Sequence, residues 1–118
     1  MAAFGAYLNQ RRTVLNSRDP GCYSLRKVAA RAGINPSYLS QIENGKQSPP
    51  GEDTIVRLAG ILEEDADVLL AMAGKVSSEL QAIIARRPRL FSQLLRSLKN
   101  EPDHAILHLV REVRDGSW

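Results

Sequence analysis

The chain has 118 residues, which is the size of one ordinary domain or of one small domain with an appendage. Hydrophobic residues make up 43% and charged residues 25%, so the composition allows a core and excludes a disordered chain. The longest apolar runs are far shorter than the about 20 residues of a membrane helix, and the start shows no apolar signal region. We therefore expect a cytoplasmic protein with no membrane partner. A single cysteine, Cys22, excludes an intrachain disulfide and a thiolate metal cluster.

The charge is unevenly distributed along the chain. The net charge is +3, but residues 1–48 hold seven bases and two acids, whereas residues 49–74 hold one base and six acids. Residues 75–118 hold eight bases and five acids. The basic first segment favours a polyanionic partner such as nucleic acid. A solvated surface with charges sorted by chance explains the same numbers.

Helical periodicity begins at the N-terminus. Apolar residues spaced over 4–15 predict a first helix, and Asp19-Pro20-Gly21 then signals a turn. Ser24 is suited to cap a second helix over residues 25–32. Gly33 is expected to end that helix, because glycine readily adopts the left-handed backbone found at helix ends.

Three more helices are predicted before residue 75. Asn35 and Pro36 supply an N-cap and a first helical residue for the third helix. A fourth helix follows the bend at residues 49–51, and its apolar face is formed by Ile55, Leu58, Ala59 and Leu62. Residues 67–73 predict a fifth helix, which Gly74 closes.

The sequence changes in character after Gly74. Three amphipathic segments follow, and they open at Ser77 or Ser78, at Pro88 and at Pro102. We expect eight helices and no strand, and therefore an all-α fold. We place one five-helix domain in residues 1–74 and a helical dimerisation or interaction region in residues 75–118.

The stretch from Ser24 to Lys46 predicts two helices that cross near a right angle. Ala29 is small enough for the helices to approach, and Gly33 allows the tight corner. Apolar residues then fill the wedge between the helices: Ile34, Leu39 and Ile42. This spacing is typical of a helix-turn-helix.

The opposite side of the third helix is expected to be exposed and rich in hydrogen-bonding side chains, namely Ser37, Tyr38, Gln41 and Asn44. A helix that is only solvated more often carries Glu and Lys there. Glutamine suits bidentate contact with adenine, and serine serves several bases. We therefore prefer DNA recognition to a helical hairpin within a bundle.

Residues 4–73 resemble the phage-repressor and Cro-like helix-turn-helix family, which is often called the xenobiotic-response-element class. The resemblance is carried by Phe4-Gly5, by Leu8 through Arg12, by the Ala29, Gly33, Leu39 and Ile42 set, by residues 42–46 and by Leu58-Ala59. It implies five packed helices with the third in the major groove of double-stranded DNA. It also implies a dimeric transcriptional regulator on a palindromic operator, with repression of its own or a neighbouring operon as our preferred role.

The resemblance also implies roles for single residues. Pro36, Ser37 and Gln41 fall where the family reads bases, and Tyr38 lies beside them. The remaining implied residues contact phosphates, Ser24 through its helix N-terminus and Asn44 and Lys46 through the loop after the third helix. Arg12 and Glu43 are implied to form a structural ion pair.

The chain departs from the family pattern at two places. Leu25 stands where the family often has a glutamine that contacts DNA. The loop over residues 47–51 lacks the arginines with which phage members enter the minor groove, so we expect no minor-groove reading by this loop.

The C-terminal region lies outside the resemblance. Its apolar stripes are too extensive for short independent helices, so they either fold back on the first domain or pair two chains. We prefer a homodimer, because helix-turn-helix proteins gain affinity by occupying two half-sites. The dimerisation residues would be Phe91, Leu94, Leu95, Leu98, Ile106, Leu109, Val110 and Val113.

The same sequence also allows functions other than that of a transcriptional regulator. An antitoxin of the same fold would bind a toxin through its C-terminal helices, and a pure adaptor would bind no DNA. The resemblance also allows a regulatory protease as a partner. The pair His104 and His108 lacks a third metal ligand, and no nucleophile–base arrangement or phosphate loop appears. We therefore expect no metal, no cofactor and no enzymatic activity.

Overall fold

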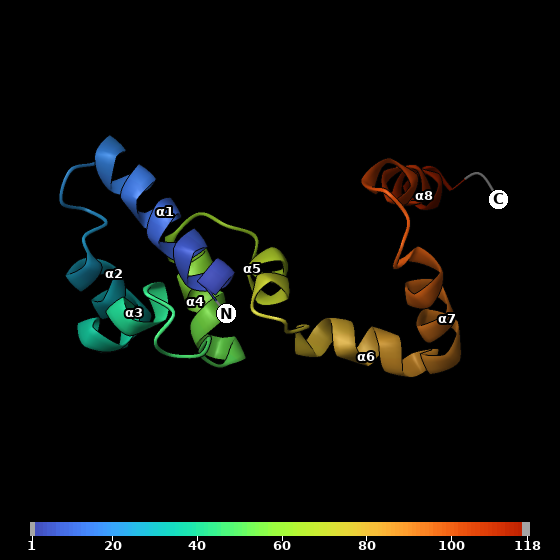
Figure 1. Ribbon diagram of the computed structural model, residues 1–118, viewed down its shortest axis with the longest axis horizontal. Helices are drawn as coiled ribbons and strands as arrows, with labels where there is room; N and C mark the ends of the chain where they lie inside the picture. The colour runs from blue at the N-terminus through green and yellow to red at the C-terminus, as the bar shows by residue number, and fades with distance from the viewer. Residues whose placement is uncertain (1, 117–118) are drawn as a thin grey trace. The chain divides into compact units, whose positions relative to one another are not determined.

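The computed structural model describes residues 2–116, and over this range it contains eight α-helices and no strand (Figure 1). The helices are α1 (Ala2–Arg18), α2 (Leu25–Ala32), α3 (Pro36–Glu43), α4 (Glu52–Ile61), α5 (Ala66–Met72), α6 (Ser78–Arg86), α7 (Pro88–Leu98) and α8 (Asp103–Asp115). The expected all-α fold is thereby confirmed. The chain divides into two compact units, residues 1–77 and residues 78–118, and each is described by itself.

Side chains cap the starts of three helices in the first unit. The Ser24 hydroxyl accepts a hydrogen bond from the Lys27 amide at 3.3 Å. The Asn35 side chain accepts one from the Ser37 amide at 2.8 Å, and Pro36 follows as the first residue of α3. Asp65 accepts hydrogen bonds from two amides at the start of α5. These contacts satisfy amide groups that a helix cannot pair internally.

Four helices of the first unit end in the same way. A residue in left-handed backbone follows each of α2, α3, α4 and α5, and these residues are Gly33, Gly45, Glu63 and Gly74. The next amide then reaches back to a carbonyl five residues earlier, for example from Ile34 to Ala29 at 3.0 Å. This is the Schellman arrangement, which satisfies carbonyls at the helix end. Glu63 is the one non-glycine residue with positive φ in the described range, at 56°.

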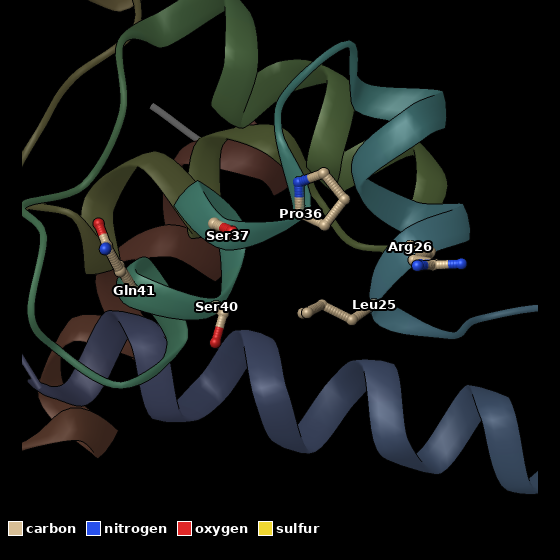
Figure 2. Close-up of a pocket in the computed structure, with 6 residues that line it drawn as sticks. All are labelled: Leu25, Arg26, Pro36, Ser37, Ser40 and Gln41. Atoms are coloured by element: carbon tan, nitrogen blue, oxygen red, sulfur yellow. The ribbon is translucent and has the colours of Figure 1, made fainter.

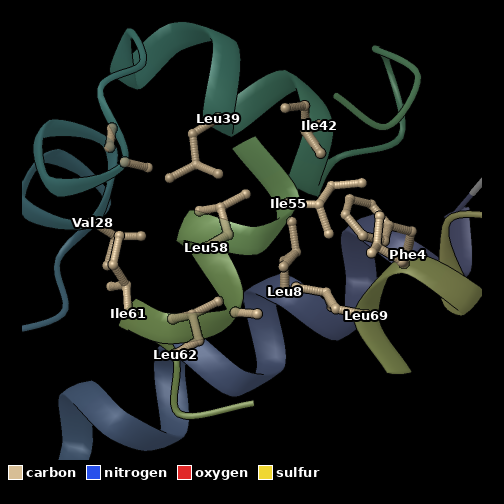
Figure 3. Close-up of a cluster of buried hydrophobic side chains, with 14 of the residues drawn as sticks. Phe4, Leu8, Val28, Leu39, Ile42, Ile55, Leu58, Ile61, Leu62 and Leu69 are labelled. Atoms are coloured by element: carbon tan, nitrogen blue, oxygen red, sulfur yellow. The ribbon is translucent and has the colours of Figure 1, made fainter. Parts of the chain in front are cut away.

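One hydrophobic core holds the five helices of the first unit together (Figure 3). α4 packs against α2 and α5, α1 packs against α3 and α5, and α2 packs against α3. The predicted apolar face of α4 is fully buried. The largest buried side chains are Phe4, Leu8, Leu39, Ile42, Ile55, Leu58, Leu62, Leu69, Leu70 and Val28.

The second unit consists of α6, α7 and α8, and none of these helices buries a residue. α6 packs against α7. Several large apolar side chains are about half exposed or more, including Leu90 at 62%, Leu95 at 58% and Val113 at 54%. No helix in residues 2–116 combines the length and the apolar character needed to cross a bilayer.

Candidate nucleic-acid interface

α2 and α3 together line a shallow, open hollow of about 410 Å³ on the surface of the first unit (Figure 2). α2 contributes Leu25 and Arg26, and α3 contributes Pro36, Ser37, Ser40 and Gln41. Leu25 and Arg26 are the first two residues of α2, and Pro36 and Ser37 are the first two residues of α3. The amino ends of both helices therefore border the same hollow. Helix amino ends carry partial positive charge, which suits an anionic ligand such as a phosphate backbone.

The residues predicted to contact DNA lie on or beside this face. Ser37 and Gln41 are exposed and line the hollow, where Pro36 is partly buried. Ser24 is also partly buried, because its hydroxyl caps α2 immediately before Leu25. Asn44 and Lys46 are exposed just beyond the end of α3.

Tyr38 requires a correction. The helical spacing predicts an exposed side chain at this position of the third helix, but the Tyr38 side chain is partly buried and packs against the hydrophobic core. An aromatic ring buries a large apolar area, and this gain outweighs the exposure that the polar hydroxyl would favour.

The loop after α3 is held in a defined shape. The Lys46 amide donates to the Gln41 carbonyl at 2.8 Å, and the Gln47 amide donates to the same oxygen at 3.2 Å. Gly45 makes this turn possible through its positive φ of 74°. The Asn44 amide group also donates to the Ser40 hydroxyl at 3.5 Å. Lys46 is thereby fixed in backbone position next to the carboxyl end of α3, while its side chain stays in solvent.

A buried ion pair attaches α3 to α1. The Arg12 guanidinium donates to both Glu43 carboxylate oxygens, from Nε at 2.8 Å and from Nη2 at 2.9 Å. Asn9 Nδ2 donates to Glu43 Oε1 at 2.8 Å, and Arg12 Nη1 reaches the Tyr23 carbonyl at 3.3 Å. The two side chains of the pair are only 15% and 4% exposed. This bidentate geometry fixes the orientation of α3 relative to α1.

Gly5 brings α1 into direct contact with the end of α3. A Cβ atom at this position would lie 2.1 Å from the Ile42 carbonyl oxygen and 2.9 Å from that of Glu43. Both atoms belong to the backbone, so neither can move aside as the end of a side chain would. The two helices therefore approach as closely as they do because residue 5 has no side chain.

Two arginines that add to the basic charge of the sequence contact carbonyls at helix ends. Arg11 donates to the Leu62 carbonyl at 2.9 Å, at the carboxyl end of α4. Arg57 donates to the Ala32 carbonyl at 3.0 Å, at the end of α2. Arg26 is the base that lines the hollow, and two further exposed bases, Lys27 and Lys46, lie on α2 and just after α3.

The roles of four residues that build this interface were not predicted from the sequence. Arg26 and Ser40 line the hollow, and Asn9 and Gly5 hold α3 in place. The one local signal was the position of Arg26, a base in the first turn of the second helix and next to Leu25 in the sequence. The contacts of Asn9 and Gly5 join distant parts of the chain, and no local pattern reveals them.

A second polar contact connects α1 to the loop between α4 and α5. The Tyr7 hydroxyl donates a hydrogen bond to the Glu64 carboxylate. This hydrogen bond, together with partial burial, raises the pKa of Tyr7 above its ordinary value of 10.0. The contact lies away from the hollow, and we assign it to packing of the domain.

The histidines of the second unit give no sign of a metal centre. His108 Nε2 lies 3.0 Å from Glu112 Oε1, one helical turn along α8, and both side chains are exposed. Within residues 2–116, no three His, Cys, Asp or Glu side chains gather closely enough to hold a metal ion.

Comparison with known proteins agrees with this geometry. Residues 18–69 match the family model described as helix-turn-helix. The chain is 34% identical over 61 residues to an uncharacterized HTH-type transcriptional regulator of Mycobacterium tuberculosis. The aligned segment covers 52% of this chain and 43% of the relative. The chain is also 31% identical over 78 residues to the uncharacterized HTH-type transcriptional regulator RghRB of Bacillus subtilis, and this alignment covers 66% of the chain and 52% of the relative. The chain thus spans about half the length of these relatives. No solved structure matches it significantly.

Proposed function

Because the chain belongs to the helix-turn-helix family through residues 18–69, we propose that it is a sequence-specific DNA-binding transcriptional regulator. The observation that carries the proposal is the shared hollow of α2 and α3. It places a glutamine, two serines and an arginine beside two helix amino ends on one exposed face. This set combines groups that read base edges with groups that attract phosphates.

In this proposal α3 is the recognition helix. Ser37 and Gln41 contact base edges in the major groove, and Pro36 sets the start of the helix against the DNA. Ser24, Asn44 and Lys46 flank them and contact phosphates, and Tyr38 supports the helix from its partly buried side. The Arg12–Glu43 pair acts at a distance, since it holds α3 in the orientation that the groove requires.

The proposed biological unit is a homodimer. α6, α7 and α8 each carry an apolar stripe and bury none of their residues, which supports pairing through residues 75–118. A dimer on a palindromic operator would bring two recognition helices into successive major grooves.

We further propose that binding represses transcription, because a bound dimer over a promoter excludes the polymerase. A reporter gene behind the selected site tests this, and activation of the reporter would contradict repression.

The experiment for DNA binding starts from a pool of random duplexes, from which the chain selects its preferred site. Gln41→Ala should weaken binding to the selected site by about 1–3 kcal/mol and leave binding to scrambled DNA almost unchanged. Gln10→Ala removes the same side chain from the exposed surface of α1 and serves as the control. Equal loss in both variants, or loss in neither, would contradict base reading by α3.

Phosphate contact by Lys46 predicts a different pattern. Lys46→Ala should weaken binding to selected and scrambled duplexes alike and reduce the slope of log affinity against log salt by about one. Lys99→Ala removes an equal charge from the end of α7 and should leave that slope unchanged. A loss confined to the selected site would contradict a phosphate role for Lys46.

A further inference from the structure

The hollow between α2 and α3 contains an apolar surface within an otherwise polar face. Leu25 and Pro36 are its two apolar side chains, and the other four residues that line it are polar or charged. Figure 2 shows Leu25 extending from α2 toward Ser40 on α3, whereas Arg26 extends the other way. The apolar surface therefore lies beside the polar groups of α3 that are proposed to read bases.

Leu25 is held in a defined position. It is partly buried and packs against the hydrophobic core, so part of its side chain is fixed while the rest lines the hollow. Pro36 is equally constrained, because its ring fixes the backbone at the first turn of α3. A rigid apolar surface of this kind binds a matching apolar group favourably, because little conformational entropy is lost on contact.

DNA offers one apolar group to a side chain in the major groove. The edges of guanine, cytosine and adenine present only hydrogen-bond donors and acceptors there, whereas thymine adds a C5-methyl group beside its O4 acceptor. Leu25 would lie unfavourably against any of the polar groups. Ser40 and Gln41 line the same hollow and carry hydrogen-bond donors, which suit the O4 acceptor of thymine.

We infer that Leu25, with Pro36, forms a contact site for the C5-methyl group of a pyrimidine, and that it makes thymine the preferred base at one position of each half-site. The inference rests on the proposed function and extends it to a specificity-determining residue on α2. Unmodified DNA carries this methyl group only on thymine, and 5-methylcytosine carries it in the same place.

The test uses the full chain and its selected duplex, in which each thymine is replaced in turn by deoxyuridine. This change removes the methyl group and leaves every hydrogen-bonding group in place. Burial of one methyl-sized group is worth about 0.8 kcal/mol, so the dissociation constant should rise about fourfold at one thymine of each half-site and stay unchanged at the others.

A variant assigns this effect to the residue. Leu25→Ala should bind the thymine and deoxyuridine duplexes equally well at that position, whereas Val68→Ala, which shortens an exposed side chain on α5, should keep the fourfold difference. When a C·G pair replaces the critical T·A pair, methylation of the cytosine at C5 should restore about fourfold in affinity. This comparison separates the methyl group from the rest of the thymine.

Two outcomes would overturn the inference alone while the chain still binds its selected site. In one, the unmodified chain tolerates every deoxyuridine. In the other, Leu25→Ala retains the full deoxyuridine penalty. A chain that selects no DNA site would overturn the proposed function, and this inference with it. The deoxyuridine series needs no variant, so it can still overturn the inference if Leu25→Ala loses stability through its core contact.

Discussion

Two glycines in helices of the first unit differ in what surrounds them, and they predict opposite effects of the same change. Gly5→Ala should destabilise the chain by about 3 kcal/mol, because its Cβ would overlap the Ile42 carbonyl oxygen. A Cβ atom at Gly60, in α4, would meet nothing within 4 Å. Gly60→Ala should therefore stabilise by about 0.5–1 kcal/mol through helix propensity. Urea unfolding of both variants measures these differences, and equal effects would contradict the close approach of α1 to α3.

The Glu43 carboxylate accepts three hydrogen bonds, so its removal should be costly. Glu43→Ala leaves a nearly buried Arg12 guanidinium without its partner and should destabilise by about 3 kcal/mol. The double variant Arg12→Met with Glu43→Leu should lose less unfolding free energy than Arg12→Met and Glu43→Leu lose separately when summed, because it removes both charges. Additive losses in the unfolding free energy would show that the two residues act independently.

The raised pKa of Tyr7 predicts a pH dependence on the alkaline side. The folded chain holds this proton more tightly than the unfolded chain, so the contact stabilises the fold below the ordinary pKa of 10.0. That contribution is lost as the pH rises from this value through the higher pKa of the folded state. An absorbance titration of tyrosinate, taken as the difference between the unmodified chain and Tyr7→Phe, measures the pKa. A difference curve centred at or below 10.0 would contradict the contact with Glu64.

At the scale of the helices, the sequence predicted almost every element because the signals at helix ends are local. Ser24, Asn35 and Pro36 begin helices where their side chains or rings satisfy the first turn, and Gly33 ends one where positive φ is needed. The exception is the end of α4. Glutamate is a poor signal for left-handed backbone, so the Schellman turn at Glu63 could not be anticipated.

This exception makes a prediction about the α4–α5 connection. Glu63→Gly should raise the unfolding free energy by about 0.5 kcal/mol, because relief of left-handed strain exceeds the loss of a weak 3.4 Å contact from Tyr23. Gly33→Ala makes the reverse change at the end of α2 and should lower stability by about 1 kcal/mol. Thermal unfolding compares the two variants. Destabilisation by Glu63→Gly would show that the side chain of Glu63 matters more than its backbone.

The candidate site was only partly predictable. Ser37 and Gln41 were found because helical spacing alone places them on the side of α3 opposite Leu39 and Ile42. Tyr38 was misplaced, because packing decides the burial of an aromatic ring and no local pattern reports it. The roles of Arg11 and Arg57 at helix ends depend on residues 51 and 25 positions away in sequence, which composition cannot show.

At the scale of the whole molecule, the two units should have separate roles. A chain that ends after Ser77 keeps the complete core of α1–α5 and should fold on its own. It should sediment as a monomer, and its affinity for the selected palindrome should fall about 100-fold or more, because two half-site contacts are no longer joined. A shortened chain that remains dimeric and binds normally would place the dimer interface in the first unit and leave α6–α8 for another protein partner.

The proposed function requires that the face shared by α2 and α3 contacts DNA. Backbone amide resonances of the full chain, followed by nuclear magnetic resonance during titration with the selected duplex, test it most directly. If this face contacts DNA, the largest chemical-shift changes should fall at residues 24–27 of α2, at residues 37–41 of α3 and at Lys46, and a scrambled duplex should produce weaker changes at the same places. Largest changes in α4, α5 or the second unit, with α3 unaffected, would contradict it.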